Sequence, residues 1–115
     1  MSGMKVVVGG TLDEVGAAFV SAWERAEKGE AFQDRAIVFE SWHGLAKVLT
    51  GKRYDLLRYV RHHSVPSVAS LARALGRDYR RVHADVDALV SAGLLDRSNG
   101  GVKADYDAIE TRIAI

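Results

Sequence analysis

Two helical patterns flank a single glycine, Gly76, in the run SVASLARALGRDYRRVHADVDALVSAGLLDR, which spans residues 67–97. In each pattern apolar residues recur every three or four positions, the spacing that puts their side chains on one helix face. Gly76 and Gly93 follow the last apolar positions, where a glycine in the left-handed conformation can end a helix. The run therefore predicts two short helices joined by so few residues that they must cross sharply.

Each of these helices is preceded by a residue that can cap it. Ser67 and Asp78 stand just before the two apolar patterns, and their side-chain oxygens can accept hydrogen bonds from the free N–H groups of the first turn. Beyond the helices, residues 94–97 and 102–104 read as two strands around the glycine-rich turn 98–101. A β-hairpin is therefore expected after the helix pair, as the wing of a winged helix-turn-helix.

The N-terminal third shows a β-α-β pattern. Aliphatic runs at Lys5–Val8 and Arg35–Phe39 predict strands, and Thr11 can cap a helix whose apolar face includes Trp23. Two strands alone are marginal, so a third is expected from elsewhere in the chain. Residues 109–115 alternate between apolar and polar side chains and predict a strand. This strand either completes the N-terminal sheet or pairs across a dimer.

Two further helices are expected between this pattern and the helix pair. Ser41 can cap a helix that runs to residue 49, and Thr50 can cap a second one over residues 51–62. The second of them would share a core with the helix pair. Trp42 lies on the apolar stripe of the first and is expected in the core or at a dimer interface, as is the tryptophan of the N-terminal helix.

These patterns predict an α+β chain in three parts. Residues 1–40 would form a β-α-β extension for dimerisation or partner binding, and residues 41–104 a winged helix-turn-helix domain. Residues 105–115 would form a C-terminal strand or tail.

Basic charge is concentrated around the helix pair. Residues 51–103 carry ten Lys and Arg against five Asp and Glu, whereas the whole chain has a formal net charge of +1. Such a local surplus is the electrostatic footprint of a surface that binds a polyanion. Arg80 and Arg81 stand at the start of the second helix, where the helix dipole disfavours cations. A phosphate or a guanine edge would be attracted by both arginines and by the free N–H groups there.

Neighbouring polar residues have both a structural and a nucleic-acid-binding interpretation. Lys52 and Arg53, in the first turn of the preceding helix, are candidates for phosphate contact or for a solvated face. Tyr79 can stack on a sugar or cover the first helix of the pair. His83 faces the presumed groove or is an ordinary surface residue.

Two carboxylates on the second helix are expected to pair with its basic residues. Asp85 and Asp87 can pair with neighbours such as Arg81 and His83. Asp87 can alternatively accept a hydrogen bond from a cytosine amino group.

Most other functions lack the residues that they need. The chain has no cysteine, which removes disulfides, thiolate metal sites and a cysteine nucleophile. His62 and His63 diverge on a helix and are expected to contact its terminal carbonyl groups instead of a metal. Gly9 and Gly10 lack the context of a phosphate loop. Without a catalytic motif, signal peptide or membrane-length apolar run, we expect a cytoplasmic protein that is not an enzyme and has no cofactor or metal.

The segments VLTGKRYDLL and LARALGRDYRRVHADVDAL carry a family resemblance. With the glycine turn and the aliphatic end, they make residues 39–115 similar to short prokaryotic winged-helix transcriptional regulators related to the MarR group, some of which look like antitoxins. That family usually has proline at the position of Gly51 and an acidic residue at that of Ser70, so one helix start is looser here and a capping partner is missing. The resemblance implies a dimer that reads DNA with residues 78–92.

We therefore expect a sequence-specific regulator that binds double-stranded DNA, a homodimeric repressor that reads the major groove with residues 78–92. The alternative is an antitoxin-type interaction module that neutralises a cognate toxin protein and represses its own promoter. A small-molecule sensor would need a pocket. The candidate DNA-contacting residues are Lys52, Arg53, Arg77, Tyr79, Arg80, Arg81, His83, Arg97 and Lys103.

Overall fold

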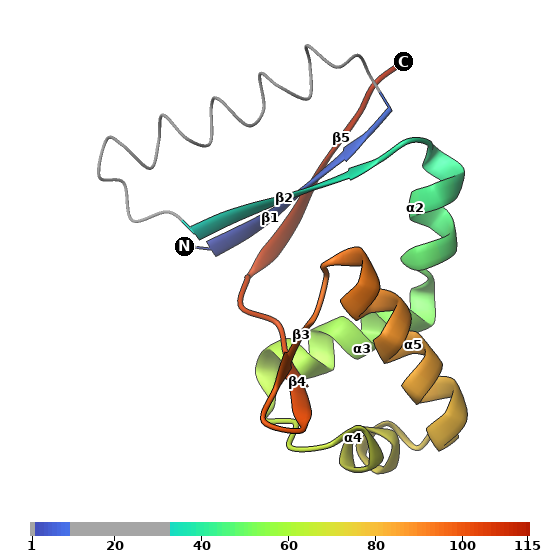
Figure 1. The fold of residues 1–115 in the computed structure, drawn as a ribbon, viewed down its shortest axis with the longest axis vertical. Coiled ribbons are helices and arrows are strands. Elements are labelled where there is room, and N and C mark those ends of the chain that lie inside the picture. Colours follow the sequence, from blue (N-terminus) through green and yellow to red (C-terminus); the bar gives the residue numbers. More distant parts are fainter. Residues whose placement is uncertain (1, 10–32) are drawn as a thin grey trace. The chain divides into compact units, whose positions relative to one another are not determined.

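The computed structural model describes residues 2–9 and 33–115, and the chain divides into two units. Residues 1–46 and 106–115 belong to the first, called here the sheet unit, and residues 47–105 to the second, the helical unit. The described residues form an α+β fold of four helices, a three-stranded sheet and a two-stranded hairpin (Figure 1). The helix expected after Thr11, with its tryptophan, lies outside the described residues.

Three parallel strands make the sheet of the sheet unit. They are β1 (Ser2–Val8), β2 (Gln33–Phe39) and β5 (Ala108–Ile113), in the order β2-β1-β5. The central strand, β1, pairs in parallel with both neighbours. Both predicted N-terminal strands are thus confirmed. The C-terminal strand completes this sheet within the chain, which was one of the two alternatives.

Buried aliphatic side chains of the central strand lie on both faces of the sheet, since Val7 is buried on the face opposite to that of Met4, Val6 and Val8. Met4, Val6 and Val8 are buried, and side chains two residues apart lie on the same face of a strand. The register places Val6 opposite Ile37 and Val8 opposite Phe39, so β2 adds its own apolar side chains to that face.

Helix α2 (Trp42–Val48) follows β2, and the boundary between the units falls within it. Ser41 caps this helix as predicted, since its Oγ accepts a hydrogen bond from the Gly44 amide at 3.2 Å. Leu45 occupies the inward position of the helix and is buried. Trp42 is 54% exposed, so the expectation that it lies in the core is wrong. Its place at a dimer interface stays a prediction.

Three helices build the helical unit, with boundaries close to the predicted ones. They are α3 (Gly51–His62), α4 (Val68–Leu75) and α5 (Tyr79–Ala92). None of the helices in the described part of the chain is long and apolar enough to cross a membrane. The apolar stripes of α3, α4 and α5 form the core of the unit, which includes Leu56, Leu57, Val60, Leu71, Ala72, Val82, Val86 and Leu89.

The ends of these helices follow from their capping residues. The side chains of Thr50, Ser67 and Asp78 each accept a hydrogen bond from the amide three residues later, at 3.0–3.3 Å. Gly76 and Gly93 end α4 and α5 with φ angles of 63° and 86°. A left-handed residue at this position favours glycine because any other side chain is strained there. The predicted caps and stops are therefore confirmed.

An antiparallel hairpin follows α5, formed by β3 (Asp96–Ser98) and β4 (Gly101–Lys103). Its turn is made by Asn99 and Gly100, with φ angles of 48° and 85°. Both residue types tolerate positive φ, which a tight hairpin turn requires.

The hairpin starts later than predicted. Leu94 and Leu95 were expected in its first strand, but they are buried, and their amides donate to the Leu89 carbonyl at 2.9 and 3.3 Å. These bonds complete the C-terminal turn of α5, so the two leucines anchor the helix end in the core before β3 begins. Ala104, expected in the return strand, lies one residue past β4.

Gly101 fixes the hairpin against the segment between α3 and α4. A Cβ atom at this position would lie 1.7 Å from the Val65 carbonyl oxygen. The same oxygen accepts a hydrogen bond from the Val102 amide at 3.3 Å. Since two backbones approach here with no room for a side chain, the close packing of the hairpin requires glycine.

Candidate nucleic-acid interface

The start of α5 presents two arginines to solvent, as the sequence predicted. Arg80 and Arg81 are exposed, and neither guanidinium has a hydrogen bond or ion pair with any residue that the structure describes. Tyr79, beside them, is 50% exposed. Asp78 Oδ2 accepts from the Arg81 amide at 3.2 Å, which holds the first turn in place while both arginine side chains remain free.

The two arginines leave the helix in different directions. Val82, Val86 and Leu89 are buried and define the inward side of α5. At 3.6 residues per turn, Arg80 lies about 160° around the helix from Val82, and Arg81 lies about 100° from it. Arg80 therefore points away from the core, whereas Arg81 points to one flank.

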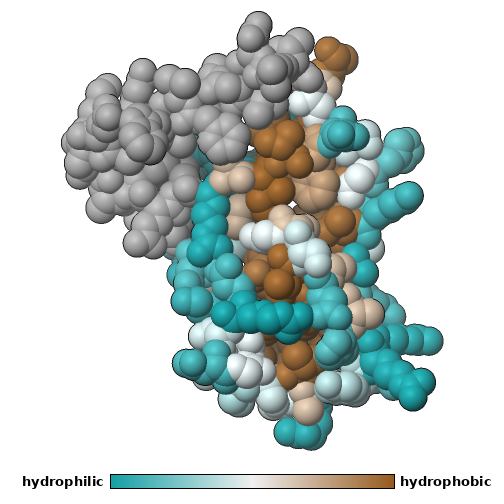
Figure 2. Space-filling model, in the orientation of Figure 1, coloured by the Kyte–Doolittle hydropathy of each residue, from teal (hydrophilic) through white to brown (hydrophobic). Residues whose placement is uncertain are grey.

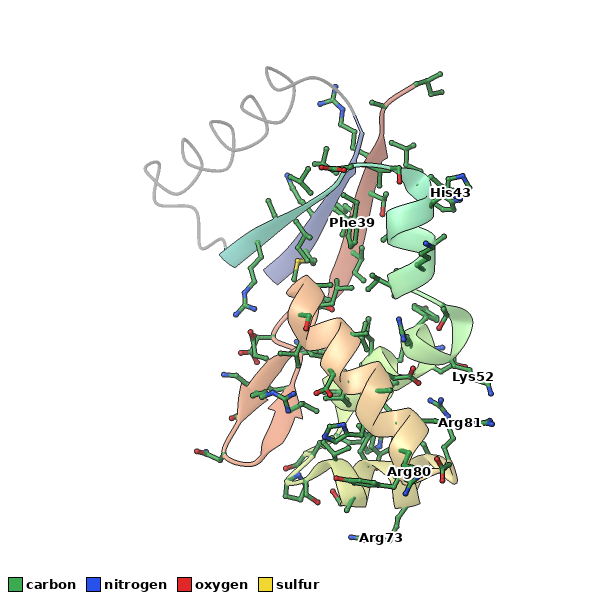
Figure 3. The ribbon with its side chains drawn as sticks, turned by 45° about the vertical axis from the view of Figure 1, so that its right-hand side comes forward. Phe39, His43, Lys52, Arg73, Arg80 and Arg81 are labelled. Atoms are coloured by element: carbon green, nitrogen blue, oxygen red, sulfur yellow. The ribbon has the colours of Figure 1, made fainter. Side chains whose placement is uncertain are left out.

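Two more exposed cations flank this helix start. Lys52 comes from the first turn of α3 and Arg73 from the last turn of α4, and both are exposed without a partner among the described residues. Figure 3 shows their side chains and those of Arg80 and Arg81 directed outward from the helical unit. We call these four residues the basic ridge. On the face drawn in Figure 2, hydrophilic side chains project around the N-terminal end of α5.

Arg73 was not among the residues predicted from the sequence. It lies in the last turn of α4, where the helix dipole favours a cation, so its position has a structural explanation. The available signal was its place on the polar side of the first helical pattern, next to the buried Leu71 and Ala72.

Arg53 lies beside Lys52 in sequence but is engaged within the protein. Its Nε donates to Asp85 Oδ1 at 3.0 Å, and its Nη1 donates to the carbonyl oxygens of Lys47 and Val48, both at 3.0 Å. Only 19% of the Arg53 side chain is exposed. The guanidinium thus joins the start of α3 to α5 and to the end of α2.

Arg77 is also engaged with Asp85. Its Nη2 lies 2.7 Å from Asp85 Oδ2, with 21% of the Arg77 side chain and 15% of the Asp85 side chain exposed. One carboxylate therefore receives both guanidinium groups. It links α3, the α4–α5 turn and α5.

The pKa of Asp85 reflects this setting. Partial burial raises the pKa of the carboxyl, but the hydrogen bonds and charges of Arg77 and Arg53 outweigh burial and hold it below its ordinary value. The expected pairing of Asp85 with a neighbour such as Arg81 is not what the structure shows. Two guanidinium groups from other elements reach both carboxylate oxygens instead.

A second carboxylate, Asp87, connects α5 to the hairpin. Its Oδ2 lies 3.2 Å from Nδ1 of His83, and its Oδ1 accepts from Nη2 of Arg97 on β3. The predicted pairing of Asp87 with His83 is thus confirmed. Lys103 pairs with Asp105 at 2.9 Å. All of these side chains are about half exposed, and surface pairs of this kind contribute about 0–1 kcal/mol.

Of the two histidines at the end of α3, His63 makes the expected contact with a carbonyl oxygen of the last turn. His63 Nδ1 lies 2.9 Å from the Tyr59 carbonyl oxygen, and the two rings stack with centroids 4.0 Å apart. This contact with a terminal carbonyl group was predicted. In the described part of the chain, no group of three or more His, Asp and Glu side chains is placed to hold a metal ion.

A protein-family model matches most of the helical unit. The model of the HVO_A0114 family matches residues 48–111, which is more than half of the chain and includes the three helices, the hairpin and most of β5. No curated protein and no solved structure matches the chain. The narrower resemblance to MarR-group regulators and antitoxins therefore stays a prediction. By its matching segment, the chain belongs to the HVO_A0114 family.

Proposed function

We propose that this protein is a sequence-specific regulator that binds double-stranded DNA. In this proposal α4 and α5 act as a helix-turn-helix, α5 enters the major groove, and the β3–β4 hairpin is the wing. One observation carries the proposal: Arg80 and Arg81 are exposed at the start of α5 and have no carboxylate partner among the described residues. Unpaired cations placed against a helix dipole destabilise the isolated protein slightly, which a polyanionic partner would reverse.

Because the two arginines point in different directions, we propose different roles for them. Arg80 points away from the core, so its planar guanidinium is placed to donate two hydrogen bonds to O6 and N7 of a guanine. Arg81, on the flank, is placed for a phosphate of the groove wall. Lys52 and Arg73 extend the positive charge to either side and would contact further phosphates, which fix the register of the protein on the duplex.

The hairpin and the first residues of α5 supply supporting contacts. Arg97 and Lys103 are each held by a carboxylate in a weak surface pair, which a phosphate can replace at little cost. Tyr79 and His83 lie beside Arg80 on α5, with ring centroids 5.7 Å apart. Arg53 and Arg77 are assigned a structural role, because both are already paired with Asp85 and largely buried.

We further propose that the protein acts as a homodimeric repressor. Two copies related by a twofold axis would present two α5 helices to successive major grooves, with half-sites about 10 bp apart or a multiple of this distance. Blocking a promoter requires only occupancy of such a site, so no additional activity is needed.

The test begins with selection of bound duplexes from a random pool, followed by titrations of the selected duplex and of random duplex. Arg80→Ala is expected to cost about 1–3 kcal/mol on the selected duplex and much less on random duplex. Arg81→Ala is expected to weaken both duplexes equally. If Arg80→Ala also weakens both equally, its base-reading role is lost. If neither variant changes affinity, α5 is not the DNA-binding element.

Arg58→Ala is the matched control, since it removes the same charge from an exposed arginine of the helical unit. Arg58 lies about 120° around α3 from Lys52, outside the basic ridge. It should leave the selectivity between the two duplexes unchanged.

A second candidate function is neutralisation of a protein toxin. Val38 and Trp42, in the sheet unit, are 44% and 54% exposed, and large exposed apolar side chains are typical of protein-binding surfaces. Co-purification with the product of an adjacent reading frame, abolished by Trp42→Ser, would support it. Retention of the partner by that variant would remove this surface from consideration.

A further inference from the structure

One of the two edges of the three-stranded sheet is formed by β5. In the order β2-β1-β5 this strand is terminal, and no strand in the described part of the chain pairs with its other side. All of its residues except Ile109 are exposed, and Ile113 is exposed by 48% although it is a large apolar residue. An edge strand presents a row of unpaired N–H and C=O groups that can template pairing with another strand.

The backbone of β5 shows which residues face outward. The Ala114 amide donates to the Val8 carbonyl at 3.0 Å, so residue 114 directs its backbone groups toward β1. Backbone groups alternate in direction along a strand. Residues 108, 110 and 112 therefore also face β1, whereas the N–H and C=O groups of Ile109, Thr111 and Ile113 point away from the sheet.

The sequence of this edge is self-complementary. Residues 108–114 read AIETRIA, in which Thr111 is the centre. Residues at equal distances from Thr111 along the strand complement each other. These pairs are Glu110 with Arg112, Ile109 with Ile113, and Ala108 with Ala114. Glu110 and Arg112 are exposed, and neither has a partner among the described residues.

We propose that β5 pairs antiparallel with β5 of a second copy of this chain, with the twofold axis at Thr111. This arrangement places Glu110 opposite Arg112 of the other copy, twice by symmetry, and Ile109 opposite Ile113. Opposite charges on directly facing residues stabilise an antiparallel pair, and like charges destabilise it. It also makes one continuous sheet from two three-stranded sheets.

The neighbouring registers are disfavoured by charge. Moving the axis to residue 110 places two glutamates opposite each other, and moving it to residue 112 does the same with two arginines. In the register centred on Thr111, Thr111 faces Thr111 of the other copy and Ile109 faces Ile113. The outward-facing N–H and C=O groups of the two strands can therefore form hydrogen bonds with each other. A twofold interface of this kind is isologous, the type that closes a dimer.

This inference rests on the dimer of the proposed function and names its surface. The surface lies in the sheet unit, whereas the proposed DNA contacts lie in the helical unit, so the two can be tested separately. Sedimentation without DNA tests the interface, and duplex titration of the arginine variants tests DNA binding.

The experiment is a charge swap, read out by sedimentation equilibrium of the full chain over a concentration series. E110R gives a strand with two positive side chains, and R112E gives one with two negative side chains. Each should weaken self-association by about tenfold or more, since two attractive pairs become repulsive. An equimolar mixture of the two variants should associate as tightly as the wild type, because every facing pair is again of opposite charge. The double variant E110R/R112E should also dimerise.

E40R is the matched control, because it makes the same charge change at an exposed position just beyond β2. It should leave self-association unchanged, and recovery in the mixture shows that both single variants are folded. A wild type that stays monomeric overturns the proposal. So do single variants that still dimerise, and so does a mixture that fails to associate, since the register would then be wrong.

Discussion

Two helices of the helical unit begin with a pair of adjacent cations, and the structure treats the two pairs differently. In α3, Lys52 is exposed while Arg53 is held by Asp85 and by two carbonyl oxygens of the preceding helix. In α5, both Arg80 and Arg81 are exposed and free of described partners. A cation at a helix start is therefore not by itself a phosphate contact. The cation is available to bind a phosphate only if the fold does not place a carboxylate of another element, such as Asp85, next to it.

The largest expected effect concerns the carboxylate that makes this difference. Asp85→Ala leaves two partly buried guanidinium groups without their carboxylate partner, and we expect the free energy of unfolding to fall by about 2–4 kcal/mol. Urea unfolding followed by circular dichroism measures it. Asp55→Ala, at an exposed position of α3, is the control and should change stability by less than about 0.5 kcal/mol. Similar losses in both variants would show that Asp85 is not a structural centre.

The adjacent residues of α3 allow a direct comparison within one turn. Arg53→Ala should lower the free energy of unfolding by about 1–3 kcal/mol, because charge-assisted hydrogen bonds to partly buried acceptors are lost. Lys52→Ala should leave stability nearly unchanged but reduce the slope of log affinity for DNA against log salt by about one. The contrast between Lys52 and Arg53 fails if the lysine variant unfolds as easily as the arginine variant.

The smallest expected effect is the pH dependence of the Asp85 cluster. The pKa of Asp85 is lower in the folded protein than in the unfolded chain, so its contribution to stability is complete above the ordinary aspartate pKa of about 4. It is lost as the pH falls through the lowered folded-state pKa. The difference in unfolding free energy between the wild type and Asp85→Asn should thus shrink below about pH 4. A difference that stays constant down to pH 2 would mean that the carboxylate charge is not what holds the arginines.

Much of the local structure follows from the sequence because its determinants are local. The caps Thr50, Ser67 and Asp78 and the stops Gly76 and Gly93 act on residues within one turn of themselves, and the structure confirms all five. Failures occurred where burial in the tertiary core decides the local structure. Leu94 and Leu95 resemble the start of a strand, but burial against the core and bonds to the end of α5 hold them in the helix terminus.

The candidate site shows the same division. Exposure of Arg80 and Arg81 could be anticipated, because the apolar stripe of α5 leaves them outside it. The engagement of Arg53 and Arg77 could not, because Asp85 is 32 positions from Arg53 in sequence and 8 positions from Arg77, which lies in the turn before α5. No helical periodicity connects residues that lie on different elements.

The sequence by itself determined where the described helices begin and end and which faces of them are apolar, since capping, glycine stops and helical periodicity act over a few residues. Tertiary structure alone decided which side of β1 receives the C-terminal strand and which arginines pair with Asp85. Both outcomes depend on groups that meet in space after the chain has folded, and the energies of hydrogen bonds and ion pairs depend on that proximity and on burial.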